Sequence, residues 1–189
     1  AYILRMGNLT SRFSEGKFQQ NHIENAFVNR VKTFLQLGCV PEYMMEGYVE
    51  FTPIDYSGDA IIKIANHYDK EFSIMHLLNN KHLLLTKFYE ILCQLGIKLK
   101  IVSSEEFEKM INDMLQDENK SDVLQGIIRD FNSEKKLIYE SNIKIKSDFT
   151  KEFLRKIDFE WPNIDKKYIR KYLEYLIEIG YLNIKLKED

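Results

Sequence analysis

Residues 48–77, YVEFTPIDYSGDAIIKIANHYDKEFSIMHL, decide the fold class of this chain. Residues 48–52 alternate apolar and polar side chains as a short strand does, and Pro53, which has no N–H group to donate, is predicted to end it. Asp55 is a candidate N-cap for the helix that follows. The inward side of this helix is predicted to carry Ala60, Ile61, Ile64 and Ala65. Because residues 72–77 then form a buried-looking strand, the order strand, helix, strand predicts an α/β fold.

The flanking sequence extends this α/β pattern over residues 1–102. Residues 2–6 read as a strand, and the apolar spacing over 21–37 predicts an amphipathic helix. Gly38 is expected to end that helix, because glycine adopts the left-handed conformation without Cβ strain. Thr86 is a candidate cap for another helix, and residues 98–102 alternate as a short strand.

Residues 103–189 are predicted to form a mainly helical segment. Ser103 or Ser104 can cap a helix whose first turn carries acidic residues, which the helix dipole favours. Residues 132–136 form a polar break, and further helices are predicted over 148–156 and from residue 165. The last helix should bury Ile169, Tyr172, Leu173, Leu176 and Ile177. The chain as a whole is therefore expected to be α/β and mostly helical.

Composition argues against several classes of function. There are 27 Lys and Arg against 29 Asp and Glu, a net charge of −2, so a nucleic-acid partner is not expected. No apolar run approaches the roughly 20 residues that span a bilayer, and the first residues lack the signal-peptide pattern. We therefore expect a cytoplasmic protein that neither spans nor binds a membrane. Cys39, Cys93 and the four histidines fit no ligand spacing, which predicts no metal site.

The glycines bear on cofactor binding. No two of the eight glycines lie closer than nine positions, so the chain contains neither a Gly-rich dinucleotide turn nor a P-loop. A Tyr-x-x-x-Lys pattern occurs at residues 181–185, but it follows the helix-ending Gly180 and is not expected to form a catalytic pair. The residues alone therefore predict no catalytic group.

The last helix has a basic polar face. This face carries Lys166, Lys167, Arg170 and Lys171. A winged-helix DNA reader could show such a face, but Glu174 and Glu178 interrupt the positive field, which favours a solvated surface.

Several segments, taken in order, resemble the carboxy-terminal half of thioester reductase domains, which end nonribosomal peptide synthetases and are extended short-chain dehydrogenase/reductases. The early segments are residues 5–9 (RMGNL), 16–21 (GKFQQN), 25–30 (NAFVNR), 51–56 (FTPIDY) and 59–61 (DAI). The late segments are Phe149-Thr150, Leu154, 159–162 (FEWP), Tyr168, Tyr172 and 179–182 (IGYL). Together they cover nearly the whole chain.

The resemblance implies part of an enzyme. In such reductases an amino-terminal Rossmann half binds NADPH through its Gly-rich turn and supplies the catalytic Tyr, Lys and Ser/Thr, and we expect that half to be missing here. The chain would then be the substrate-binding portion of an NAD(P)H-dependent oxidoreductase that releases a carrier-protein-bound acyl or peptidyl thioester as an aldehyde or alcohol. By itself it is expected to be inactive and to bind no cofactor.

The resemblance also implies site residues. Met6, Gly7 and Asn8 would lie at a strand end that contacts the nicotinamide of the cofactor. Substrate-binding residues would be Phe18, Gln19, Asn21, Asn25, Pro53, Asp55 and Tyr56. The asparagines have an alternative role in loop ordering and helix capping, and Asp55 has one as a cap.

Three kinds of partner follow from the resemblance. They are a carrier protein with a phosphopantetheine-linked chain, the missing Rossmann half, and a second copy pairing along the strand edge at residues 2–8. The alternative function is a non-catalytic helical module that docks an acidic carrier protein or another subunit, with Lys167 and Arg170 as the expected contacts.

Overall fold

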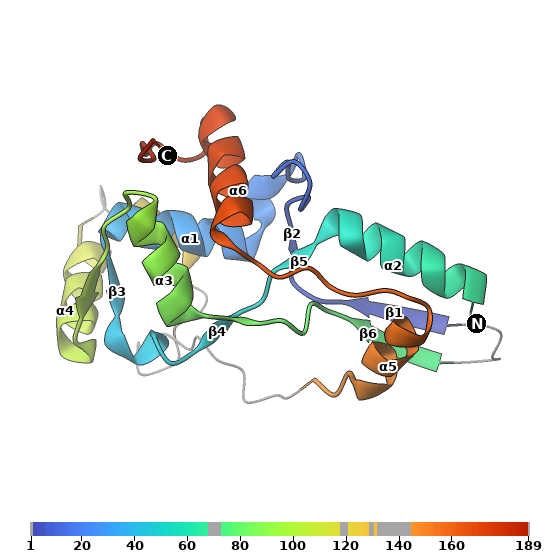
Figure 1. The fold of residues 1–189 in the computed structure, drawn as a ribbon. Helices are drawn as coiled ribbons and strands as arrows, with labels where there is room; N and C mark the ends of the chain where they lie inside the picture. The colour runs from blue at the N-terminus through green and yellow to red at the C-terminus, as the bar shows by residue number, and fades with distance from the viewer. Residues whose placement is uncertain (1, 68–72, 118–120, 129–130, 132–144, 189) are drawn as a thin grey trace. The chain divides into compact units, whose positions relative to one another are not determined.

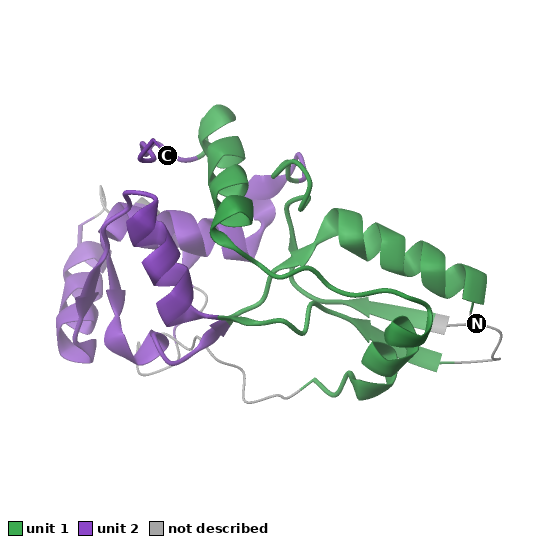
Figure 2. Cartoon of the chain, viewed as in Figure 1, with its two compact units in different colours: residues 1–18, 49–83, 143–181 green, residues 19–48, 84–142, 182–189 purple. Residues whose placement is uncertain are grey.

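The computed structural model of this 189-residue chain describes residues 2–67, 73–117, 121–128, 131 and 145–188. The chain forms two compact units, each built from separate segments (Figure 2). Unit 1 contains residues 1–18, 49–83 and 143–181, and unit 2 contains residues 19–48, 84–142 and 182–189. Neither unit follows the predicted boundary at residue 102, because each draws on residues from both sides of it.

Unit 1 is organised around two parallel strand pairs. Strand β1 (Tyr2–Met6) pairs with β6 (Ser73–Leu77), with Tyr2 opposite Ser73 and Met6 opposite Leu77. Strand β2 (Leu9–Thr10) pairs with β5 (Thr52–Pro53). The strands predicted at 2–6 and 72–77 are confirmed, although Phe72 lies outside the described residues.

The strand predicted at 48–52 is two short strands. Strand β4 (Tyr48–Val49) pairs with β7 (Leu83–Leu84), and β5 begins only at Thr52. Alternation alone could not show this division, because the two pieces have different partner strands.

Helix α2 (Ile54–His67) runs alongside β1 and β6 (Figure 1). It packs with α5 (Asp148–Lys156) on the inner face of β6. This core contains Ala60, Ile64, Met75, Leu77, Leu154, Phe159 and Trp161. Two details of the prediction were wrong: Ile61 and Ala65 are exposed, and Asp55 lies inside the first turn of α2, where its side chain bonds to a distant loop instead of capping the helix.

Helix α6 (Lys166–Glu178) completes unit 1. The Tyr168 N–H donates to Asp165 Oδ1 at 2.8 Å, which caps the helix. The predicted inward residues Ile169, Tyr172, Leu173 and Leu176 are buried, and Ile177 is half-buried. Gly180 follows with φ +72°, as expected of a helix-ending glycine.

Unit 2 begins with a short 3₁₀ turn, η1 (His22–Glu24), and helix α1 (Ala26–Leu37). The helix therefore starts later than the predicted residue 21, because the Asn25 side chain caps it by accepting from the Val28 N–H. Gly38 ends it with φ +69°, as predicted. Directly afterwards, β3 (Cys39–Pro41), a strand that the sequence did not predict, pairs in parallel with β8 (Lys100–Val102).

The remaining elements of unit 2 are mainly helical. They are η2 (Glu42–Met44), α3 (Leu85–Gln94), α4 (Ser104–Leu115) and η3 (Ser121–Gly126). Ser103 caps α4 by accepting from the Glu106 N–H, as predicted. Thr86, in contrast, lies inside α3, whose N-cap is Leu84. The predicted polar break at 132–136 falls outside the described residues.

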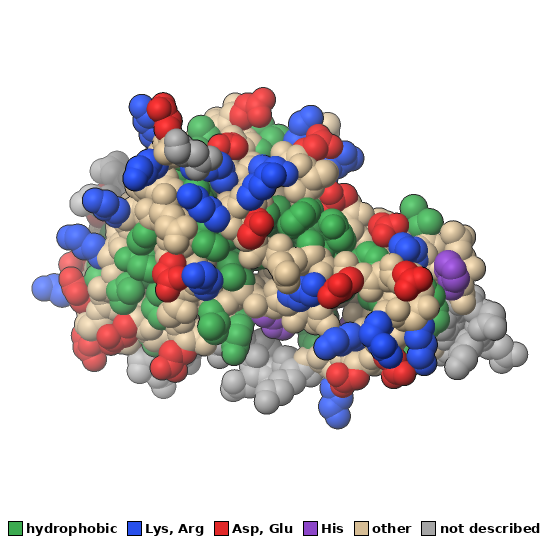
Figure 3. Space-filling model, viewed as in Figure 1, with side chains coloured by type: hydrophobic (Ala, Val, Ile, Leu, Met, Phe, Trp, Pro, Cys, Tyr) green, Lys and Arg blue, Asp and Glu red, His purple; other side chains and the backbone are tan. Residues whose placement is uncertain are grey.

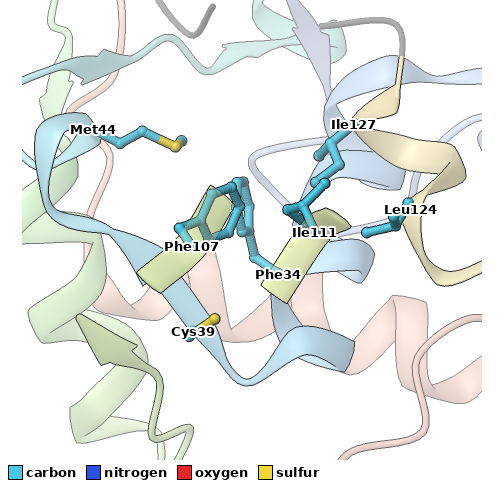
Figure 4. Packing of buried hydrophobic residues seen from close by; sticks show 7 residues of the cluster. All are labelled: Phe34, Cys39, Met44, Phe107, Ile111, Leu124 and Ile127. Atoms are coloured by element: carbon cyan, nitrogen blue, oxygen red, sulfur yellow. The ribbon is translucent and has the colours of Figure 1, made fainter. Parts of the chain in front are cut away.

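The core of unit 2 has two phenylalanine rings at its centre (Figure 4). The rings of Phe34 and Phe107 lie with their centroids 6.3 Å apart. Around them pack Cys39, Met44, Ile111, Leu124 and Ile127. In the described part of the chain no helix is both long and apolar enough to cross a membrane.

Candidate functional site

A polar cluster lies at the carboxyl end of β1, where Gly7 and Asn8 follow the strand. The Gly7 N–H donates to the Leu77 carbonyl at 2.7 Å. The Asn8 N–H donates to Glu50 Oε1 at 2.7 Å, and its side-chain amide donates to the Glu50 carbonyl at 3.2 Å. Asn8 is therefore held by Glu50 from both its backbone and its side chain.

Thr52 and Asn79 extend this cluster into the interior of unit 1. The Thr52 hydroxyl donates to Glu50 Oε1 at 2.6 Å and accepts from the Asn79 N–H at 2.9 Å. The Asn79 side chain donates to the Pro162 carbonyl at 3.2 Å and accepts from the Lys81 N–H at 3.0 Å. Because Thr52 and Asn79 are buried, these bonds satisfy groups that water does not reach.

Gly7 is required by the packing of this cluster. A Cβ added there would collide with Glu50 Oε1 and would lie 2.7 Å from the Leu78 Cβ and 3.0 Å from the Thr52 hydroxyl. The groups that approach this glycine are thus the chain's own side chains. Contact of Met6, Gly7 and Asn8 with a nicotinamide stays a prediction.

A second group of contacts fixes the loop after β2. The Asp55 carboxylate accepts from the Phe13 N–H at 2.9 Å, the Ser14 N–H at 3.1 Å and the Ser14 hydroxyl at 3.0 Å. Burial alone would raise the pKa of Asp55, but these donors outweigh it and lower the pKa below its usual value. Asp55, chosen from the sequence as a pocket or cap residue, acts here as an anchor for the loop.

Helix α6 holds the same loop through Tyr168. Its hydroxyl donates to Thr10 Oγ1 at 2.9 Å or to the Ser11 carbonyl at 3.1 Å, and accepts from the Ser11 hydroxyl at 3.0 Å. Burial raises the pKa of Tyr168 to about 12, against the opposing effect of the bonds with Ser11 and Thr10.

Lys171, one turn further along α6, reaches the loop from the same side. It donates to the Ser14 carbonyl at 2.7 Å and to the Phe13 carbonyl at 3.4 Å. Gly16 has φ +77°, and a Cβ there would collide with the Lys171 carbonyl oxygen. We call residues 10–18 the docked loop. Asp55 accepts hydrogen bonds from N–H groups of this loop, and side chains of α6 donate to its carbonyl groups.

Two of the predicted substrate residues in unit 1 are aromatic and lie against the core. Phe18 packs its ring edge-on against Tyr172, with centroids 5.8 Å apart, and its carbonyl accepts from the Tyr175 hydroxyl at 3.3 Å. Tyr56 packs edge-on against Phe13 and Phe159. Phe18 is buried and Tyr56 is half-buried, so both contribute to packing whatever they bind.

The other predicted residues make local contacts. In unit 1, the Pro53 carbonyl accepts from the Ser57 hydroxyl at 2.9 Å. In unit 2, Asn25 caps α1, and the Asn21 amide donates to Glu24 at 3.3 Å. Gln19 also belongs to unit 2 and is half-buried. The alternative role in capping thus describes Asn25, whereas substrate contact by these residues is untested.

The basic face of α6 is only partly a solvated surface. Lys171 donates a hydrogen bond to the docked loop, and Arg170 pairs with Glu174 at 3.5 Å. Lys167 is exposed. Within the described ranges no group of three His, Cys, Asp or Glu side chains could hold a metal ion.

Sequence reasoning missed the residues that build these contacts. Glu50 was predicted as a polar position of a strand, and Tyr168 was named only as part of the segment that resembles the reductase tail. The available signal was polar side chains next to buried positions at strand ends, where buried polar groups need partners.

Comparison with known proteins shows which proteins this chain resembles. No protein-family model matches the chain. A subunit of the linear gramicidin synthase of Brevibacillus parabrevis is 23% identical over 190 residues, which cover 96% of this chain and 4% of that protein.

Two solved structures extend the comparison to the fold. A thiolation-reductase di-domain from an archaeal nonribosomal peptide synthetase is 31% identical, with a TM-score of 0.80, over 95% of this chain and 36% of that one. The terminal R domain of the myxalamid PKS-NRPS pathway is 18% identical, with a TM-score of 0.76, over 97% of this chain and 45% of that one. The α/β fold and the resemblance to terminal reductase domains of nonribosomal peptide synthetases are confirmed. The chain spans less than half the length of each of these proteins.

Proposed function

We propose that this chain is the substrate-binding, carboxy-terminal portion of an NAD(P)H-dependent thioester reductase that releases a carrier-protein-bound acyl or peptidyl thioester as an aldehyde or alcohol. The observation that carries the proposal is the 31% identity and TM-score of 0.80 to a thiolation-reductase di-domain over 95% of the chain. The cofactor-binding turn and the catalytic Tyr and Lys would belong to a Rossmann half outside these residues.

The β1–β6 pair supports this proposal, because apolar side chains on its outer face are exposed. Ile3 and Ile74 are paired neighbours on that face and are 47% and 40% exposed. The inner face, with Leu4 and Met75, packs on the core of unit 1. Parallel sheets occur almost only with both faces covered, so this pair fits a larger sheet.

The two edges of this pair differ, which indicates where further strands would join. On β6, the His76 N–H donates to the Thr150 hydroxyl of α5 at 3.0 Å, so the helix caps this edge. Among the described residues, none pairs with the outer edge of β1. The Rossmann half would therefore add its strand beside β1. A second copy of the chain is the competing partner for the same edge.

The polar cluster and the docked loop suit the substrate side of such a site. Ligands of α/β sheets bind at the carboxyl ends of the strands, which is where β1 leads into Gly7 and Asn8. NADPH, bound to the other half, would supply the hydride. Met6, Gly7 and Asn8 would face the nicotinamide, and the docked loop with Pro53, Asp55 and Tyr56 would form a fixed wall toward the thioester. Gln19, Asn21 and Asn25 are proposed at the phosphopantetheine entrance.

A chimera tests the proposal. The segment of the archaeal thiolation-reductase di-domain that matches this chain is replaced by residues 1–189, and NADPH consumption is followed with an acyl thioester loaded on its carrier domain. We expect turnover by the chimera and none by the di-domain without the segment or by the 189-residue chain alone. A folded chimera that binds NADPH but reduces no thioester would contradict the proposal, and so would tight NADPH binding and turnover by the chain alone.

A binding assay separates the carrier-docking role from reduction. If the carrier contact is on α6, charge reversal at Lys167 and Arg170 weakens binding of an acidic carrier protein. Lys87 of α3, paired with Glu90 at 2.8 Å, supplies a matched control for charge reversal. Unchanged binding in the α6 variant would exclude this face as the docking surface. The cytoplasmic location stays a prediction.

A further inference from the structure

Unit 1 contains a hollow of about 670 Å³ that none of the predicted site residues lines. It lies between α5, residues 80–81 and residues 158–161. Its volume is within the range of roughly 300–1,000 Å³ that small-molecule sites occupy. The hollow is therefore a candidate ligand site that is separate from the polar cluster.

One wall of the hollow is cationic. Lys151 and Arg155 both line it and lie four residues apart on α5, which places them on one helix face. Both are exposed, and neither has an ion-pair partner among the residues that the structure describes. Lys156 on the same helix differs, because it pairs with Glu152 at 3.1 Å and does not line the hollow.

A third cation faces the hollow from residues 80–81. Lys81 pairs with Glu160 at 2.9 Å, but the Glu160 side chain is 84% exposed. Such a surface ion pair is weak, so Lys81 can exchange Glu160 for another anion at little cost. Asp158 is the other acidic residue of the lining, which leaves three cations against two carboxylates. Lys and Arg side chains gather over α5 with acidic ones among them (Figure 3).

Two aromatic residues also line the hollow. Phe159 and Trp161 pack edge-on with ring centroids 5.1 Å apart; both are buried and both line the hollow. Leu154 of α5 completes this apolar surface. The lining thus combines charged side chains with apolar ones.

We propose that this hollow binds an organic phosphate monoester with a compact apolar body. Lys151 and Arg155 would hold the phosphate, with the planar guanidinium supplying two parallel N–H donors, and Lys81 would turn toward it from Glu160. The apolar body would lie on Phe159 and Trp161. A dianion with several acceptor oxygens can bond to more than one of the three cations that line the hollow, whereas a single carboxylate offers fewer acceptors. The inference does not depend on the reductase activity proposed above.

Trp161 gives the test a local signal, because it is the single tryptophan of the chain. The 189-residue chain is titrated with phenyl phosphate, inorganic phosphate and phenol while tryptophan fluorescence is recorded. We expect a saturable change with phenyl phosphate, weaker binding of inorganic phosphate seen by its competition, and no saturation with phenol. Absence of saturation with phenyl phosphate, or an equal response to phenol, would overturn the proposal.

Charge variants make the test specific to this wall. Lys151→Gln combined with Arg155→Gln should weaken phenyl phosphate binding by about tenfold or more, since charge-assisted bonds are lost. Lys156→Gln removes the same kind of charge from the same helix and should leave binding within about twofold. Asp158→Asn, which retains a residue tolerant of φ +53°, should tighten it. Equal weakening by the Lys156 variant would overturn the proposal, because the attraction would then be non-specific.

Discussion

The two units differ in what they bury. Among the described residues, six of the seven buried polar side chains lie in unit 1: Thr10, Ser11, Thr52, Ser57, Asn79 and Thr150. Unit 2 has Thr33 alone among the residues that the structure describes. Its core is a cluster of aliphatic, methionine and phenylalanine side chains with Cys39.

This difference shows how each unit fixes its backbone. In unit 1, side-chain hydrogen bonds from Thr52, Asp55 and Tyr168 hold irregular segments next to strand ends. In unit 2, apolar packing holds the elements, with caps such as Asn25 and Ser103 at helix starts. Buried hydrogen bonds are directional, so unit 1 has the more precisely positioned loops, as a binding wall requires.

The largest expected effect concerns the apolar core of unit 2. Phe107 is 1% exposed and packs against Phe34. Phe107→Ala should lower the free energy of unfolding by about 3–5 kcal/mol, because it removes buried apolar surface and leaves a cavity. Urea unfolding measures this loss. A loss below about 1 kcal/mol would show that packing does not hold this unit.

In unit 1, Tyr168→Phe tests the hydroxyl that holds the docked loop. Its removal leaves buried polar groups of Thr10 and Ser11 without this partner, which should cost about 1–3 kcal/mol at neutral pH. Since the pKa of Tyr168 rises to about 12 on folding, its stabilising effect is complete below the unfolded value near 10 and is lost as pH rises through 12. The variant should therefore lose less stability than the parent over that range; equal losses would contradict this role.

Two matched threonine variants compare the units directly. Thr52→Val removes a hydroxyl that donates to Glu50 and accepts from Asn79, whereas Thr33→Val removes one that donates to the Val123 carbonyl. We expect the first to cost about 1–3 kcal/mol and the second about 1 kcal/mol. Urea unfolding curves measure both losses in the free energy of unfolding. A larger loss for Thr33→Val than for Thr52→Val would contradict the contrast between the units.

The smallest effect is that of Asp55→Asn, and it depends on pH. Because folding lowers the pKa of Asp55, the ionised carboxylate stabilises the fold above its unfolded pKa, and this stabilisation is lost as pH falls through the folded pKa. The difference in stability between the parent chain and the variant should therefore shrink as the solution becomes more acidic. A constant difference would show that the bonds to Phe13 and Ser14 do not depend on the charge.

The sequence predicted the elements that periodicity and capping define. Strands β1 and β6, the burial along α6, the Ser103 cap and the ends at Gly38 and Gly180 follow from local patterns. Strand β3 was missed because it has three residues, one of them a proline, and is specified by pairing with β8 about 60 residues later in the chain.

The candidate site was predictable only in part. Asp55 was singled out, but its partners Phe13 and Ser14 lie more than 40 residues earlier, so no local pattern connects them. The same holds for Glu50 and Asn8, and for Tyr168 and the docked loop. Tyr168 was not among the predicted inward residues of α6, although it is buried, and helix periodicity does not show what its hydroxyl bonds to.

The proposed function requires the β1–β6 pair to be part of a larger parallel sheet, and amide hydrogen exchange tests this most directly. Exchange is measured for β1 in the 189-residue chain and in the di-domain chimera, with Cys39 and Val40 of β3 as the internal reference. We predict that β1 amides become strongly protected in the chimera, while those of β3 keep their rates. Unchanged exchange along β1 in a folded chimera would contradict the proposed function.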